Sequence, residues 1–293
     1  MMISFTDAVE AALLADDQPA VTDYDLYARA RAIRAAGEWD GRAIKRNPTE
    51  WDVSRLRNLL RRLADKSAIA QDMDFNSGVW RIVQSTRAGS AEEIACIADP
   101  FCYVSHLSAM QRYGLTDRSP EALHLTRPAR ALWNAMRDEK MGLEGADEEA
   151  KALFLRFGIG ETLRRRPVVT HETRHPATPV AVRGERTRIS SIGRTFIDML
   201  THPDLCGGMR HALDVWDRSA GQFIDEIIPA VDATSSKIDK VRAGYILEER
   251  LQIDDPRIQA WRAFAQRGGS RKLDPEAPYA PTFSETWMIS LNV

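Results

Sequence analysis

The chain has 293 residues, enough for about two domains, and its 44% hydrophobic and 28% charged content is that of an ordinary globular protein. Its apolar runs are too short to cross a membrane, and its acidic start is unlike a secretory signal, so we expect a cytoplasmic protein with no membrane partner. Its three cysteines lack the spacing of a disulfide framework or a zinc site.

Charge is distributed unevenly along the chain. Residues 1–25 hold six acidic residues and no Lys or Arg, whereas residues 26–88 hold 13 Lys or Arg against seven Asp or Glu, a net charge of +6. A locally basic segment is typical of a nucleic-acid-binding surface, although a solvated helix face has the same composition. The neighbouring pattern must therefore decide between the two.

The basic segment begins with a predicted helix over residues 23–39, which Gly37 should end. We interpret residues 40–48 as a connector with at most one helical turn. A second helix is predicted at about 50–66, with Thr49 as its N-cap. Its apolar positions follow helical spacing and are Val53, Leu56, Leu59, Leu60 and Leu63.

A two-stranded hairpin over about 68–83 follows this helix, with a turn at Asp74 to Gly78. Helices that end in an Arg-rich amphipathic helix and continue into a hairpin are typical of a winged helix-turn-helix. We therefore predict such a DNA-binding domain over residues 1–88, with 50–66 as its reading helix and 68–83 as its wing.

The side of the reading helix away from the leucines predicts the DNA contacts. Asn can read adenine and Arg can read guanine with paired hydrogen bonds, while flanking Arg and Lys hold phosphates. For Trp51 packing is the alternative, and Trp80 and Ile82 fit the hairpin core. The candidate DNA-binding residues are Lys45, Arg46, Trp51, Ser54, Arg55, Arg57, Asn58, Arg61, Arg62 and Asn76.

Residues 89–293 predict a mixed α/β C-terminal domain, reached through a linker at 85–95, so the whole chain is of the α+β class. A short strand and a helix that Gly114 ends come first, and residues 131–150 suggest a polar surface insertion. Strands are predicted at 123–127, 152–158, 167–172, 179–184, 187–191 and 285–293. Helices are predicted at 191–202, 207–220, 235–251 and 256–268.

Residues 171–175, HETRH, match the H-E-x-x-H signature of zinc proteases. That signature needs a helix, which places both histidines on one face, but Pro176 and the flanking VVT and VAV predict strands joined by a turn. The pattern therefore indicates no zinc site.

Other enzyme motifs are sparse. Ser105 and His106 are adjacent at a helix start, where neighbours do not face each other. The G-x-G at 158–160 lacks a phosphate loop, and Asp198 fits a structural partner of Arg194. The run 164–166 fits a solvated approach to a strand, with a second nucleic-acid contact as the alternative. We expect no catalytic activity, cofactor or metal.

Three segments, at 104–116, 193–208 and 287–292, follow the pattern vSH-x-SAl-x-x-xGLt, x-RT-x-iD-x-L-x-x-P-x-x-xGG and W-x-i-x-x-N. With the predicted winged helix, this order resembles the AbiEi family of antitoxins from type IV toxin–antitoxin systems in phage defence by abortive infection, over nearly the whole chain. Two departures are the Gly193 that stands where the family usually has Glu, and the insertion near 134–149.

The resemblance implies that residues 1–88 bind inverted repeats in the promoter of the chain's own operon and repress it. It implies that residues 89–293 form an antitoxin domain that counters a nucleotidyltransferase toxin, with no stable complex required. A homodimer on DNA is expected because winged helices often read paired half-sites. The alternatives are a nuclease or a ligand-sensing transcription factor targeted by the winged helix.

Overall fold

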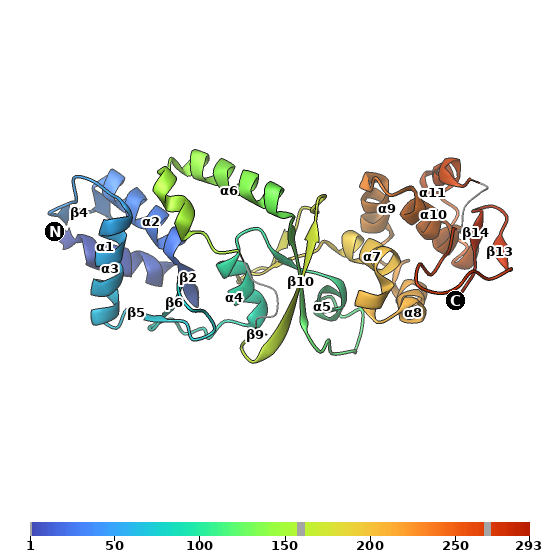
Figure 1. Ribbon diagram of the computed structural model, residues 1–293, viewed down its shortest axis with the longest axis horizontal. Helices are drawn as coiled ribbons and strands as arrows, with labels where there is room; N and C mark the ends of the chain where they lie inside the picture. The colour runs from blue at the N-terminus through green and yellow to red at the C-terminus, as the bar shows by residue number, and fades with distance from the viewer. Residues whose placement is uncertain (1, 157–161, 267–270) are drawn as a thin grey trace. The chain divides into compact units, whose positions relative to one another are not determined.

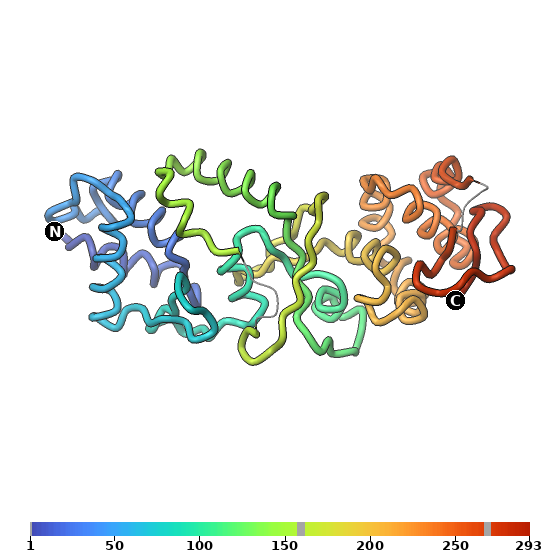
Figure 2. The backbone as a smooth tube through the Cα atoms, in the orientation of Figure 1, coloured from blue at the N-terminus to red at the C-terminus, as the bar shows by residue number. Residues whose placement is uncertain are grey.

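The computed structural model describes residues 2–156, 162–266 and 271–293 (Figures 1 and 2). The chain divides into two compact units. Unit 1 comprises residues 1–103, 125–176 and 181–188, and unit 2 comprises residues 104–124, 177–180 and 189–293. This division does not fall at residue 88, so a separate domain over 1–88 stays a prediction. Helices and small sheets occur in both units, which gives the predicted α+β class.

The N-terminal part of unit 1 holds three helices and two small sheets (Figure 1). Its elements are β1 (Met2–Ser4), α1 (Phe5–Ala15), β2 (Ala20–Thr22), α2 (Asp23–Ala36), β3 (Glu38–Trp39), β4 (Arg42–Lys45), α3 (Val53–Asp65), β5 (Ile69–Gln71) and β6 (Val79–Ile82). β2, β6 and β5 form an antiparallel sheet in that order. The predicted helix after Thr22 and the predicted hairpin are therefore confirmed.

Local chemistry sets the bounds of α2. The Thr22 hydroxyl accepts a hydrogen bond from the backbone N–H of Asp25 at 3.0 Å, which caps the first turn. Gly37 ends the helix with a φ of +71°, a left-handed conformation that glycine adopts without strain. This end confirms the predicted stop.

The connector after α2 differs from its prediction. Instead of a helical turn, residues 38–45 form a hairpin, with Glu38 paired to Ala43, and β4 also pairs in parallel with β1. The turn Asp40–Gly41 has positive φ at both residues, the geometry of a tight hairpin turn. The Asp-Gly pair in the sequence is a hairpin signature that helical propensity alone does not register.

The core of this region is formed by α1, α2 and α3. It joins Val9 and Leu13 of α1, Leu26 and Tyr27 of α2, and the leucines of α3 in one buried cluster. Each fully buried Leu contributes about 1.5–3 kcal/mol relative to an exposed one. The leucine spacing that predicted α3 is therefore what seats this helix.

Residues 130–144, predicted to be part of a polar insertion, form the continuous helix α6 (Arg130–Glu144). Its C-terminal end is fixed to α2: the Tyr24 hydroxyl donates to the Glu144 carboxylate at 2.5 Å, and Arg31 donates to the Glu144 carbonyl at 2.6 Å. Trp133 and Met141 are buried. The prediction was wrong because a long exposed polar side hid a narrow apolar one.

A six-stranded sheet has the order β11-β12-β7-β8-β10-β9. Its strands are β7 (Tyr103–Val104), β8 (Leu123–Pro128), β9 (Thr162–Leu163), β10 (Arg166–Thr173), β11 (Val180–Ala181) and β12 (Arg188–Ile189). α4 (Ala91–Ala98) replaces the second half of the predicted linker, with Ser90 as its N-cap. The strand expected at 152–158 is absent from its described residues, where a 3-10 helix (Glu148–Leu153) lies; residues 157 and 158, and with them the G-x-G, fall outside the described chain.

Unit 2 is mostly helical. Its remaining elements are α5 (His106–Arg112), α7 (Ile192–Thr201), a 3-10 helix (Pro203–Cys206), α8 (Met209–Ser219), α9 (Ile224–Ala233), α10 (Lys237–Gly244), a π-helix (Tyr245–Arg250), α11 (Pro256–Ala260), a 3-10 helix (Trp261–Phe264), β13 (Phe283–Ser284) and β14 (Ile289–Ser290). The predicted helices at 191–202 and 207–220 are confirmed. α9 was missed because Pro229 interrupts its pattern.

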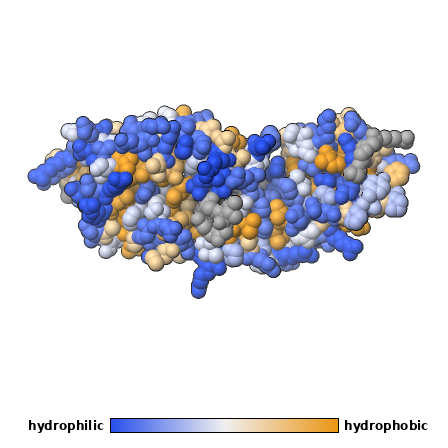
Figure 3. All heavy atoms as spheres, viewed as in Figure 1, coloured by the Kyte–Doolittle hydropathy of each residue, from blue (hydrophilic) through white to orange (hydrophobic). Residues whose placement is uncertain are grey.

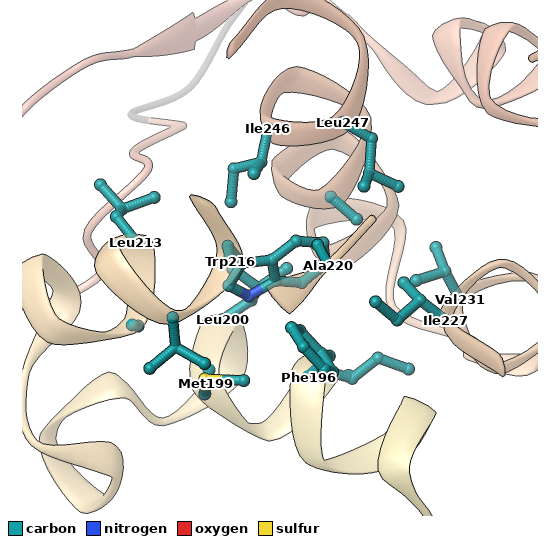
Figure 4. Close-up of a cluster of buried hydrophobic side chains, with 14 of the residues drawn as sticks. Phe196, Met199, Leu200, Leu213, Trp216, Ala220, Ile227, Val231, Ile246 and Leu247 are labelled. Carbon is teal, nitrogen blue, oxygen red and sulfur yellow. The ribbon is translucent and has the colours of Figure 1, made fainter. Parts of the chain in front are cut away.

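Trp216 lies at the centre of the unit 2 core, with Phe196, Ile227 and Ile246 around it (Figure 4). The rings of Phe196 and Trp216 meet edge to face, with centroids 5.1 Å apart. Across the described residues, no helix has both the length and the apolar character that crossing a bilayer requires.

Candidate nucleic-acid interface

α3 begins three residues later than predicted. Asp52, not Thr49, is the N-cap, and its carboxylate accepts a hydrogen bond from the backbone N–H of Arg55 at 2.7 Å. A carboxylate at this position also interacts favourably with the positive end of the helix dipole. Leu56, Leu59, Leu60 and Leu63 are buried, so the predicted phase of the helix is confirmed.

The opposite side of α3 is exposed and cationic. Ser54, Arg57, Asn58, Arg61 and Arg62 are all exposed. Within the described chain, no carboxylate lies at ion-pair distance from Arg57, Arg61 or Arg62, and the Arg61 guanidinium contacts only the Asn58 side-chain oxygen, at 3.4 Å. Hydrophilic side chains gather over the region of α3 in the view of Figure 3. These guanidiniums are therefore available to an external anion.

Arg55 is the partial exception on this helix. It is half-buried, and its guanidinium lies 3.5 Å from Glu50 and 3.8 Å from Asp52. Both pairs are long and solvated, and such pairs contribute at most about 1 kcal/mol. An approaching phosphate can therefore compete with them.

Trp51 does not lie on α3, and its role differs from the predicted DNA contact. Its side chain is buried, packs against Phe5 with ring centroids 5.4 Å apart, and donates from Nε1 to the Tyr27 carbonyl at 3.1 Å. The later start of the helix is the reason: Trp51 precedes the first turn and faces the core. We therefore leave Trp51 out of the interface.

Lys45 and Arg46 are exposed at the end of β4, while Ile44, which precedes them, is buried. Arg46 has a φ of +55°, so the backbone turns sharply there toward α3. Neither side chain has an ion-pair partner in the part of the chain that is described. Both are available to hold phosphates, as the sequence suggested.

The turn between β5 and β6 places Asn76 at an exposed tip, and Gly78 closes it with a φ of +82°. Arg81 on β6 is also exposed, between the paired residues Ala20 and Ala70, and was not predicted from the sequence. Trp80 is half-buried and donates to the Asp23 carboxylate at 2.7 Å, whereas Ile82 is buried, so both support the hairpin.

Arg164 fixes the base of this turn. Its guanidinium binds the buried Asp72 carboxylate at 2.7 and 3.0 Å and also pairs with Asp74. Burial by itself would raise the pKa of Asp72, but the Arg164 guanidinium and the Asp74 backbone N–H outweigh it and hold that pKa below its ordinary value. The turn's acidic charges are thereby compensated.

The run 164–166 is therefore mostly structural. Besides Arg164, Arg166 pairs with Glu92 at 2.7 Å, and only Arg165 is exposed. The expectation of a wholly solvated run was wrong because acidic partners far apart in sequence meet it.

The HETRH segment is not helical, as predicted: His171 and Glu172 lie on β10, and Glu172 pairs with Arg127 and Arg156. Among the described residues, no three His, Cys, Asp or Glu side chains are grouped to hold a metal ion.

The Ser105–His106 pair differs from its prediction. The Ser105 hydroxyl and His106 Nδ1 are 2.8 Å apart and buried, because His106 has a φ of +51° that turns its ring back toward Ser105. Arg194 and Asp198 form the predicted pair, at 2.8 Å.

No family model and no curated protein matches the chain. Among solved structures, the crystal structure of the RV2827C protein from Mycobacterium tuberculosis aligns with 97% of this chain and 90% of that chain, at 15% sequence identity and a TM-score of 0.46. A likeness of this strength carries no argument about function.

Proposed function

We propose that the chain is a DNA-binding transcriptional autorepressor whose residues 1–88 act as a winged helix-turn-helix. The order α1, β2, α2, α3, β5, β6 supports this, because the first strand pairs beside the hairpin that follows α3. The β3–β4 hairpin lengthens the connection between α2 and α3 beyond the usual short turn.

The observation that carries the proposal is the two-sided nature of α3. Its leucine side is buried in the core of unit 1, and its opposite side presents to solvent guanidiniums that have no ion-pair partner among the described residues. In this function α3 enters the major groove, where Asn58 and Arg61 read base edges. Phosphates are held by the flanking cations, namely Lys45, Arg46, Arg55, Arg57 and Arg62.

The hairpin β5–β6 acts as the wing in this proposal. Asn76 and Arg81 then contact the DNA backbone beside the groove that α3 occupies. Two copies of the chain bind an inverted repeat, with half-site centres separated by about one helical turn, roughly 34–36 Å, or a multiple of it. Paired half-sites explain how a single short helix achieves operator specificity.

We further propose, from the sequence resemblance, that the C-terminal part is an antitoxin domain that counteracts a nucleotidyltransferase toxin without a stable complex. The three sequence segments that carry the resemblance support it. The Ser105–His106 pair and the Arg194–Asp198 pair both belong to these segments and are closely packed. Their arrangement supports a defined site in this domain, and no catalytic role is assigned to it.

The repressor function is tested with the full chain and the DNA upstream of its own gene. We expect a footprint over an inverted repeat, and weaker footprinting when Arg57 and Arg61 are changed to Gln. Arg210→Gln, which changes an exposed Arg on α8, serves as the matched control and should leave the footprint intact. Equal protection by all three proteins would refute the assignment of α3.

The antitoxin function is tested by co-expression with a nucleotidyltransferase encoded beside this gene. We expect growth to be restored, also by the Arg57 and Arg61 double variant, because toxin neutralisation does not use the DNA-binding face. Growth arrest that wild-type chain fails to relieve would refute the antitoxin part and leave the repressor part standing.

A further inference from the structure

Two free thiols lie against each other in unit 1. Cys96 belongs to the last turns of α4, and Cys102 directly precedes β7. The Cys102 thiol donates to the Ala95 carbonyl at 3.4 Å, and the Cys96 thiol lies 3.9 Å from the Cys102 carbonyl. The two side chains also hydrogen-bond to each other. Both sulfurs therefore occupy one small volume without any backbone movement.

Arg188 holds the chain segment between these cysteines in a closed loop. Its guanidinium donates to the carbonyls of Cys96 and Asp99 at 2.7 Å and of Cys102 at 3.0 Å. Its backbone N–H also donates to Cys96 Sγ, at 3.3 Å. One cation thus fixes both ends of the loop and stands beside one of the two sulfurs.

The surroundings distinguish the two thiols chemically. The hydrogen bond from the Cys102 thiol, followed by the charge and N–H of Arg188, lowers the pKa of Cys96 in spite of its burial. The same hydrogen bond and burial raise the pKa of Cys102 well above its ordinary value. Because the thiolate is the reactive form, Cys96 is the nucleophile of the pair.

Cys96 is reachable although it is buried. It lines a cavity of about 520 Å³ whose walls also carry Arg29, Lys140 and Arg186. An oxidant as small as hydrogen peroxide fits such a space, and the cationic walls favour a negatively charged sulfur. Cys206 differs, because it is buried in unit 2 and burial raises its pKa well above the ordinary value.

We propose that Cys96 and Cys102 form a dithiol site that a peroxide oxidises to an intramolecular disulfide. The Cys96 thiolate attacks one peroxide oxygen, the O–O bond breaks, and hydroxide leaves, which gives a sulfenic acid. Cys102 then attacks that sulfur, the S–O bond breaks, and a second hydroxide leaves. The two thiols lose two electrons and two protons, and the peroxide is reduced to two waters.

The test treats the folded, reduced full-length chain with hydrogen peroxide and then counts free thiols by alkylation and mass spectrometry. Of the three thiols, two should disappear, and a disulfide should join Cys96 and Cys102 within one chain. Cys206→Ser should form the same disulfide. Cys102→Ser should stop at a sulfenic acid on Cys96 that dimedone traps, and Cys96→Ser should keep its thiols.

A measurement on the wild-type chain guards against variants that fail to fold. At neutral pH, native alkylation should label Cys96 faster than Cys206, and dithiothreitol should restore all three thiols after oxidation. Survival of three thiols at a peroxide dose that oxidises glutathione in the same tube would overturn the proposal. Disulfides between chains, or oxidation that is unchanged in Cys96→Ser, would overturn it as well.

Discussion

Arg61 lies in the third turn of α3, where its exposed guanidinium contacts only Asn58 among the described residues. If this pair reads a base pair, Arg61→Ala should weaken specific binding by about 1–3 kcal/mol and relax specificity at one operator position. Fluorescence anisotropy with operator and scrambled duplexes measures both effects. Arg210→Ala on α8 is the control and should change neither. An equal loss on both duplexes would show that Arg61 holds only a phosphate.

Arg164 provides a prediction about pH at the same scale. Because the folded pKa of Asp72 is lowered, the pair stabilises the fold above the ordinary Asp value of 3.8, and this stability is lost as pH falls through the lowered pKa. Arg164→Ala leaves a buried carboxylate without its cation and should cost about 2 kcal/mol at neutral pH, after allowance for the partial exposure of Arg164.

Urea unfolding at several pH values measures this effect. The difference between wild type and Arg164→Ala should be largest near pH 7 and should shrink below the ordinary Asp value of 3.8. The exposed neighbour Arg165→Ala should match wild type throughout. A difference that does not vary with pH would show that Arg164 acts by packing and not by its charge.

At the scale of elements, the seat of α3 on the core is the feature on which the interface depends. Leu63 has no exposed surface, so Leu63→Ala should cost about 2–5 kcal/mol of unfolding free energy, through reduced burial and the cavity left behind. Ser54→Ala, on the exposed side, should stay within about 0.5 kcal/mol of wild type. Chemical denaturation compares the two, and similar values would contradict the observed phase of α3.

The packing of α7 on α9 depends on a single glycine. A Cβ on Gly193 would lie 2.1 Å from the Glu226 carbonyl oxygen, so no side chain fits without separating the helices. The Glu that the AbiEi pattern usually has here would need a wider spacing. Gly193→Ala should therefore destabilise the chain by about 1–3 kcal/mol or more.

Gly142 provides the matched control for Gly193. It lies within α6 with open space where a Cβ would be, so Gly142→Ala should stabilise the chain, by up to about 1 kcal/mol. Thermal unfolding measures both changes. A Gly193→Ala variant as stable as wild type would mean that α7 and α9 lie farther apart than described.

Elements with a clear period were predictable, whereas those whose form depends on distant partners were not. The leucine spacing of α3 and the Gly37 stop of α2 could be read from the chain. The start of α3 could not, because Thr49 and Asp52 are both good caps. The packing of α6 on α2 depends on Tyr24 and Glu144, which are 120 residues apart.

The same contrast applies to the candidate interface. The exposed Arg and Asn side chains of α3 followed from helical phase, but Trp51 depended on the helix boundary and faces the core. Arg81 was overlooked because an Arg within a hairpin is ordinary in composition. The compensation of Asp72 by Arg164 was not predictable, since no local pattern links residues so far apart.

At the scale of the whole molecule, a net charge of -2 would repel DNA if it were spread evenly. Binding must therefore come from one basic face, which α3 and the end of β4 form. Each phosphate that this face neutralises releases bound counterions, so affinity should fall linearly with salt on logarithmic scales. Neutralising part of the face should change this dependence in proportion.

The salt dependence of operator binding tests this claim most directly. Anisotropy titrations over a range of salt concentrations should compare the full-length wild type with a variant carrying Arg57→Gln, Arg61→Gln and Arg62→Gln. We expect the variant to bind more weakly, with a salt slope smaller by about 0.9 for every phosphate that it no longer neutralises. Two proteins with the same affinity and the same slope would show that α3 does not face the DNA.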